Sequence, residues 1–164
     1  MDKTYDLIMD MIDFNSGSPD LIQHFLKVHQ FSKIIGRREN ISQEKMELLE
    51  ASAIVHDIGI KVCMEKYGKC TGKLQEKEGP SYAKELLIRH GYSPESIDRV
   101  CFLVAHHHTY TDIHDIDYQI LIEADFLVNL YENSCDEETI QEIYESIFKT
   151  NTGQKILRQM FFEK

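Results

Sequence analysis

The sequence predicts a single all-α domain over residues 1–164, built as a helical bundle. Apolar side chains recur at intervals of three and four residues along nearly the whole chain, which is the period of a helix packed on one face. Only three prolines and eight glycines are present, too few for the many turns of a sheet protein. At 164 residues, without internal repeats, the chain is long enough for one core.

Eight helices are expected from these periods and from their start and stop signals. They are predicted at about 4–14, 19–38, 42–57, 80–90, 93–108, 117–133, from 136 onward, and 154–162. The core should span about 20–133, with the helices of 134–164 packed on it. The helix over 117–133 is apolar almost all round, as expected of a central helix.

Particular residues set the boundaries of these helices. Ser18 and Ser42 are expected to cap the second and third helices, and Pro19 suits a first turn. Gly91 provides a stop after His90. Residues 60–78 have mixed polarity and no clean period, so they are expected to form a long ordered loop with one short helical turn. A loop of that length in a compact domain is often functional.

Composition excludes several classes of protein. The formal net charge of −10 argues against a nonspecific nucleic-acid binder, which usually carries a basic stripe. The four cysteines show no CxxC spacing, which favours reduced thiols and a cytoplasmic location. No segment reaches the length of a transmembrane helix, and the first residues lack the pattern of a signal peptide. We therefore expect no nucleic-acid and no membrane partner; a homodimer stays open.

The dipeptide His56-Asp57 is the most informative feature for function. It ends an apolar helical run and supplies one nitrogen and one oxygen ligand from the same short stretch of backbone. Asp125 lies in the most apolar helix, where an isolated carboxylate would need a cation, a metal or hydrogen-bond donors. Glu123, elsewhere on that helix, is expected at the surface or beside a basic side chain.

Several histidines are candidates to complete a metal site. His29 lies on the apolar stripe of the second helix, whereas His24 is off that stripe and is expected to be solvated. Alone, His29 is as well explained as a hydrogen-bonded core residue. Of the consecutive His106, His107 and His108, helical geometry points His107 inward with His108 beside it, and turns His106 about 100° away.

In order, these residues form the pattern H…HD…D, with Lys27-Val28-His29, Ala53-Ile54-Val55-His56-Asp57-Ile58-Gly59 and Glu123-Ala124-Asp125 around them. The chain thereby resembles the HD-domain superfamily of metal-dependent phosphohydrolases, from about Leu21 to Asn133. The resemblance implies that His29, His56, Asp57 and Asp125 bind one metal in an all-helical bundle. Such nitrogen and oxygen ligands suit Mn²⁺, Fe²⁺, Co²⁺, Ni²⁺ or Zn²⁺.

Many relatives in that superfamily hold a second metal with an extra histidine, and this sequence departs from them. Its corresponding segment, residues 73–80, contains no histidine. Gln75 or Glu78 could take the place of that histidine and bind a second metal or Mg²⁺. Either residue could instead contact substrate. If the second site is absent, His106 and His107 are candidates to bind substrate or donate a proton.

The expected activity is hydrolysis of a phosphomonoester or phosphoanhydride by metal-activated water, with a nucleotide as the substrate that the resemblance favours. Asp57 is a candidate to orient that water. Lys61 and Lys73 are candidates to bind phosphate, although both could be ordinary solvated lysines, and Arg99 is a weaker candidate. The alternative is a sensor module that binds a nucleotide or metal without turnover. A purely structural metal is a third possibility.

Overall fold

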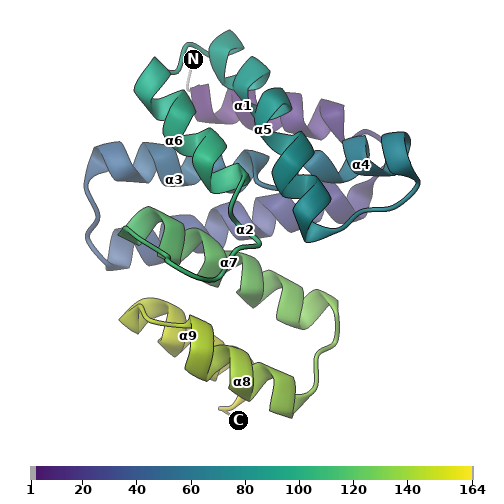
Figure 1. The fold of residues 1–164 in the computed structure, drawn as a ribbon. Coiled ribbons are helices and arrows are strands. Elements are labelled where there is room, and N and C mark those ends of the chain that lie inside the picture. Colours follow the sequence, from purple (N-terminus) through teal and green to yellow (C-terminus); the bar gives the residue numbers. More distant parts are fainter. Residues whose placement is uncertain (1–2, 164) are drawn as a thin grey trace.

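The computed structural model describes residues 3–163, and within that range every regular element is a helix (Figure 1). Nine helices are formed: α1 (Lys3–Phe14), α2 (Pro19–Arg38), α3 (Gln43–Val55), α4 (Gly59–Tyr67), α5 (Gly72–Arg89), α6 (Pro94–Val104), α7 (Ile116–Glu132), α8 (Glu137–Ile147) and α9 (Asn151–Phe161). The all-α prediction is confirmed.

Most of the predicted helix boundaries are correct for the predicted reasons. The side chain of Ser42 accepts a hydrogen bond from the backbone N–H of Lys45 and so caps α3. Gly91 follows α5 in the left-handed conformation. Ser18 precedes α2 as predicted, but its side chain makes no capping hydrogen bond; Pro19 alone marks that start.

The prediction of a loop over residues 60–78 is wrong. α4 occupies the first half of the segment, and α5 begins at Gly72, eight residues before the predicted start. The Thr71 side chain caps α5 by accepting from the N–H of Leu74, and Pro80 lies inside the helix. A proline removes one helical hydrogen bond without necessarily ending the helix, so treating Pro80 as a boundary misplaced α5.

α2 is the central helix of the bundle and packs against α3 on one side and α7 on the other (Figure 1). α4, α5 and α6 follow one another in contact, and α6 also packs on α3. α8 and α9 lie at the end of the molecule opposite α1 and contact α7. Two faces of α2 are therefore buried, one toward α3 and one toward α7.

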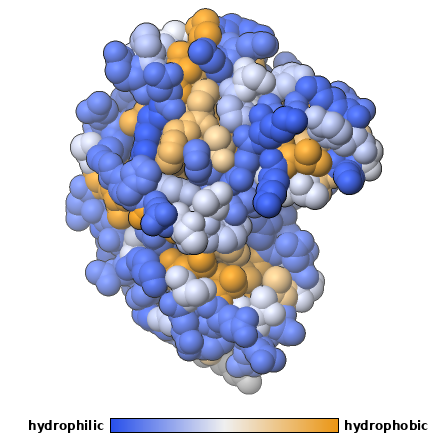
Figure 2. Space-filling model, viewed as in Figure 1, coloured by the Kyte–Doolittle hydropathy of each residue, from blue (hydrophilic) through white to orange (hydrophobic). Residues whose placement is uncertain are grey.

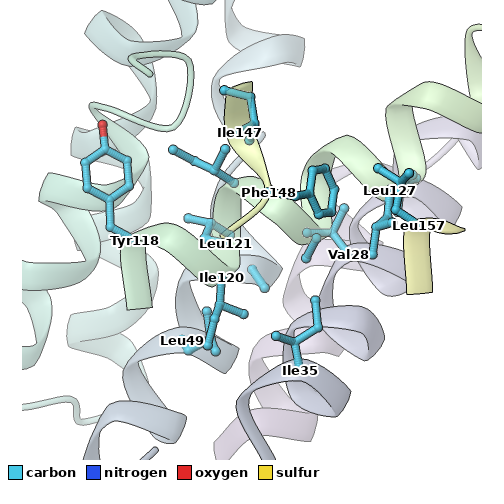
Figure 3. Close-up of a cluster of buried hydrophobic side chains, with 14 of the residues drawn as sticks. Val28, Ile35, Leu49, Tyr118, Ile120, Leu121, Leu127, Ile147, Phe148 and Leu157 are labelled. Carbon is cyan, nitrogen blue, oxygen red and sulfur yellow. The ribbon is translucent and has the colours of Figure 1, made fainter. Parts of the chain in front are cut away.

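Two groups of buried apolar side chains hold these helices together. One joins α1, α2, α3, α5 and α6, and the other joins α7 to α2, α3, α8 and α9. Figure 3 shows the second group, in which Phe148 lies beside Val28 and Leu127. Phe148 and Leu157 are almost fully buried, so burial of apolar area fastens the C-terminal helices to α7.

The face seen in Figure 2 is mostly hydrophilic, with smaller hydrophobic patches between hydrophilic side chains. Within residues 3–163, no helix combines the length and the hydropathy that crossing a bilayer requires.

Candidate metal centre

Four separate parts of the bundle bring imidazole and carboxylate groups to one buried place. α2 contributes His24, the turn after α3 contributes His56 and Asp57, the turn after α6 contributes His107, and α7 contributes Asp125. His56 and His107 have at most 1% of their surface exposed. The site therefore lies between the two groups of core side chains, where α2, α3, α6 and α7 meet.

His24 stands at the middle of the first half of this site. Its Nε2 lies 3.0 Å from Asp125 Oδ1, 3.2 Å from Asp57 Oδ2 and 3.4 Å from His56 Nε2. His56 Nε2 lies 3.4 Å from Asp57 Oδ2 and 3.5 Å from Asp125 Oδ1. The ligand atoms of His24, His56 and Asp57 thus lie within 4.8 Å of one another, and Asp125 Oδ1 lies close to both imidazoles.

Asp57 faces two directions with its two oxygens. While Oδ2 faces His24 and His56, Oδ1 lies 3.2 Å from His107 Nε2. Ligand atoms of Asp57, His107 and His108 also lie within 4.8 Å of one another. The carboxylate of Asp57 therefore connects two adjacent groups of ligand atoms.

The spacing of the first group fits a divalent metal ion. Ligand atoms about 2.1 Å from a metal and about 90–109° apart around it are separated by about 3.0–3.4 Å. The separations among His24, His56, Asp57 and Asp125 run from 3.0 to 3.5 Å where they are given above. The atoms of His24, His56 and Asp57 already form one group, and an adjustment of the side chains, that of Asp125 included, would place all four atoms around one ion.

The remaining ring nitrogens support the same interpretation. His56 Nδ1 lies 2.8 Å from the carbonyl oxygen of Ala53, and His107 Nδ1 lies 2.8 Å from that of Val104. Since a carbonyl only accepts, each Nδ1 carries a proton, and in the neutral ring this leaves the Nε2 lone pair directed into the site. His24 Nδ1 lies 3.0 Å from a carboxylate oxygen of Glu132. Metal-bound histidines are oriented in this way by outer hydrogen bonds.

The charges of the site also require a cation. Within residues 3–163, neither Asp57 nor Asp125 forms a salt bridge with a lysine or arginine; their charged partners are imidazoles. Burial disfavours a charged imidazole, but Asp57 and Asp125 outweigh it and raise the pKa of His56 well above its usual range. Burial likewise opposes ionisation of Asp57, but His56 and His107 hold its pKa well below the usual range. Both carboxylates stay ionised, and protons or a metal ion must balance them.

A close approach of α4 and α5 brings Gln75 to the edge of this site. A Cβ atom on Gly59 would lie 2.9 Å from the carbonyl oxygen of Gln75, and one on Gly79 would lie 2.9 Å from Val104. Only glycine fits at such separations. Gln75 Oε1 then lies 3.1 Å from His108 Nε2, which connects α5 to the histidine turn.

The structure does not bring His29 to the His56-Asp57 pair, and its assignment as a metal ligand is wrong. His29 lies on the face of α2 that packs against α3, where its Nε2 is 2.9 Å from Glu50 Oε2. The face directed toward α7 carries His24, which is 6% exposed and not solvated as predicted. The helical stripe containing His29 is indeed buried, but on the other side of α2 from Asp125.

Three other candidates are occupied elsewhere. Lys61 Nζ donates to the carbonyl oxygen of Phe14 at 2.7 Å, and Glu78 accepts from Lys66 and Tyr67 at 2.6 and 2.8 Å. His106 Nδ1 lies 2.7 Å from the Phe102 carbonyl, and its ring stacks on Phe102. These contacts do not support Lys61, Glu78 or His106 as groups of the site.

The two remaining basic candidates, Lys73 and Arg99, differ in whether they are available to bind phosphate. Lys73, near the start of α5, is exposed and has no partner among residues 3–163, so it stays a candidate for phosphate binding. Arg99 forms a bidentate salt bridge with Asp117 at 2.6 and 2.8 Å and is not available.

A sequence signal for His24 existed. His24, Val28 and Phe31 follow the i, i+4, i+7 rule and form a second apolar stripe on α2. A helix that packs between two others has two buried stripes, and the sequence prediction assigned the stripe with His29 to the metal site. Glu132, which orients His24, and Asn129, which donates to Asp125 at 2.9 Å, lie on α7 and were also missed.

Comparisons with known proteins agree with this geometry. The profile of the family described as HD domain matches residues 21–147, which include all the residues of the site. No curated protein matches the chain. A crystal structure of a predicted HD superfamily hydrolase from an uncultured Thermotogales bacterium is 20% identical, with a TM-score of 0.65. The match covers 97% of this chain and 83% of that one, and at this identity it shows the fold. The chain belongs to the HD domain family.

Proposed function

We propose that the protein is a metal-dependent phosphohydrolase that acts on a small phosphomonoester or phosphoanhydride. The observation that carries the proposal is the cluster of ligand atoms on His24, His56 and Asp57, with Asp125 beside both imidazoles and His107 on the second oxygen of Asp57. The printed name of the structural neighbour, a predicted HD superfamily hydrolase, supports the same class of reaction.

The proposed ligands of the metal are His24, His56, Asp57 and Asp125, with His24 in place of His29. Two imidazole nitrogens and two carboxylate oxygens suit Mn²⁺, Fe²⁺, Co²⁺, Ni²⁺ or Zn²⁺. A bound ion of this kind supplies a Lewis acid for a phosphoryl oxygen and lowers the pKa of a coordinated water toward about 7.

The residues of the chain have separate tasks in this proposal. Asp57 holds the ion through Oδ2, and its other oxygen, directed toward His107, is placed to orient a water molecule. His107 has its Nδ1 proton fixed on the Val104 carbonyl, so its Nε2 can accept a proton or bind a second ion. His108, held by Gln75, stands beside it as a further ligand or substrate contact.

A nucleotide is the first substrate class to test. Lys73 is an exposed basic side chain near the start of α5, and Gly72 beside it lies against His108. A lysine at this place would bind phosphate as a point charge.

Phosphate release tests the proposal directly. Purified protein is assayed against nucleoside mono-, di- and triphosphates and simple phosphomonoesters, with each divalent ion and after chelation. We expect turnover with at least one ion and its loss on chelation while the far-UV circular dichroism keeps its helical signal. Asp57→Asn should lower kcat/KM by more than about 100-fold, beyond the loss typical of outer-shell changes.

The matched control is Glu50→Gln, which alters another buried carboxylate outside the site and should retain activity. Tight nucleotide binding without turnover under every ion would instead assign the protein as a sensor. Unfolding on chelation would indicate a structural metal.

A further inference from the structure

A polar cavity lies away from the metal centre, at the other end of the α2–α3 pair. Its volume is about 220 Å³, and it is bounded by α2, α3 and the first turn of α1. The charged side chains that line it are Lys3, His29, Lys33, Arg37, Glu47 and Glu50. None of them belongs to the centre formed by His24, His56, Asp57 and Asp125.

The two long walls of this cavity carry opposite charges. His29, Lys33 and Arg37 follow one another at four-residue intervals and therefore share one face of α2. Glu47 and Glu50 are three residues apart and share one face of α3. A basic wall thus faces an acidic wall across the cavity.

The ion pairs across the cavity are loose except at its base. His29 Nε2 and Glu50 Oε2 are 2.9 Å apart and largely buried. Lys33 lies 3.5 Å from Glu50 and Lys3 lies 3.7 Å from Glu47, longer than ordinary hydrogen bonds, and both lysine side chains are about 40% exposed. Exposed pairs of this kind contribute little and exchange partners readily.

The guanidinium of Arg37 has no hydrogen-bond or salt-bridge partner within residues 3–163. Its guanidinium is a planar fork with five N–H donors, which matches a carboxylate or phosphate group. Here it stands at the rim of a cavity whose opposite wall already offers carboxylates. The arrangement is that of a site with one position for an anionic group and one for an ammonium group.

We propose that this cavity binds a small zwitterion of amino-acid size. Its carboxylate or phosphate group would bind Arg37 and Lys33, and its ammonium group would bind Glu47 and Glu50. The cavity is smaller than the roughly 300 Å³ at which sites for drug-sized ligands begin, which limits the ligand to about this size. The site is independent of the metal centre and of the reaction proposed for it.

Isothermal titration calorimetry on the full chain tests this site. The probes are L-glutamate and phosphoethanolamine, each up to about 10 mM, a range that covers a millimolar Kd. The first carries carboxylates and the second a phosphate, so they distinguish the two anionic groups. Inorganic phosphate and ethylamine carry the anion and the amine separately and serve as controls.

Two neighbouring arginines provide a matched pair of variants. Arg37→Gln removes the unpartnered guanidinium, and we expect it to weaken binding by at least about tenfold, as for the loss of a charge-assisted bidentate contact. Arg38→Gln makes the same change at an exposed residue that lines a different cavity, and it should bind as the wild type does.

Binding of either zwitterion, with a selective loss in Arg37→Gln, supports the site. Absence of binding by both zwitterions overturns it. Equal binding by all three proteins, or binding of inorganic phosphate as tight as that of phosphoethanolamine, also overturns it. Each of these results is obtained without added metal, so it is independent of the outcome of the phosphate-release assay.

Discussion

Replacing Gly153 with alanine should destabilise the protein, although alanine is the better helix former. Gly153 lies in the first turn of α9, directly against the buried carboxylate of Glu123 on α7. A Cβ atom at this position would lie 2.0 Å from Glu123 Oε2 and 2.8 Å from Thr150 Oγ1. Both separations are far shorter than any real contact, so the carboxylate must move.

The carboxylate cannot move without losing hydrogen bonds. Glu123 accepts from the N–H groups of Lys149 and Thr150 at 2.7 and 2.9 Å and from the Thr150 hydroxyl at 2.5 Å. A hydrogen bond to a charged group contributes about 1.5–3 kcal/mol. Alanine would regain at most about 1 kcal/mol of helix propensity. The free energy of unfolding should therefore fall by about 0.5–2 kcal/mol if one such bond is lost.

Thermal unfolding followed by circular dichroism measures this effect. In a chain of this length, 1 kcal/mol corresponds to about 2–4 °C, so the Tm should fall by about 1–8 °C. Asn151→Ala, an exposed change in the same helical turn, is the matched control and should leave the Tm nearly unchanged. A Tm of Gly153→Ala equal to or above that of the wild type would refute the proposed role of the Glu123 cap.

Three further outcomes are expected. Glu132→Gln removes the carboxylate that orients His24 and should weaken metal affinity by about 10–100-fold without loss of helical signal, as measured by competition with a fluorescent chelator. Chelation of the metal-loaded protein should lower its Tm, since an ion held at 100 times its Kd stabilises the fold by about 2.7 kcal/mol. Burial opposes ionisation of Glu50, but the hydrogen bond and charge of His29 together with Lys33 outweigh it and lower the Glu50 pKa in the folded state. The stability that ionised Glu50 contributes is thus present above its unfolded pKa of about 4.5 and is lost as pH falls through the lower folded pKa. The difference in urea midpoint between wild type and Glu50→Gln should therefore shrink from pH 7 to pH 3.

Helical periodicity was sufficient to predict the fold class and most helix boundaries. It failed over residues 60–78, where polarity is mixed and two glycines, Gly68 and Gly72, resemble loop signals. In the structure Gly68 follows α4 as its C-cap and Gly72 is the first residue of α5. The packing of α4 on α5 and of α5 on α6 stabilises these helices. Tertiary contacts of this kind cannot be derived from local sequence.

Three of the residues that converge in the candidate site, His56, Asp57 and Asp125, were among the predicted ligands, whereas His24 was not. His56, Asp57 and Asp125 meet because they belong to helix ends and faces that sequence patterns locate well. Choosing between His24 and His29 required knowing which face of α2 packs on α7. Periodicity along one helix identifies a buried stripe but does not identify its neighbour.

Glu123 shows the same limit for a single residue. It was expected at the surface, yet it is fully buried and satisfied by the backbone at the start of α9. Two of its partners are backbone N–H groups 26 and 27 residues away in sequence, which no side-chain pattern predicts. Only the packing of α9 on α7 explains its burial.

Elemental analysis of purified His24→Asn and His29→Asn tests the ligand set most directly. With His24, His56, Asp57 and Asp125 as ligands, His29→Asn should carry close to the metal content of the wild type, and His24→Asn should lose most of it while remaining helical. Metal retained by His24→Asn and lost from His29→Asn would contradict the assignment and remove the structural basis for the proposed hydrolysis.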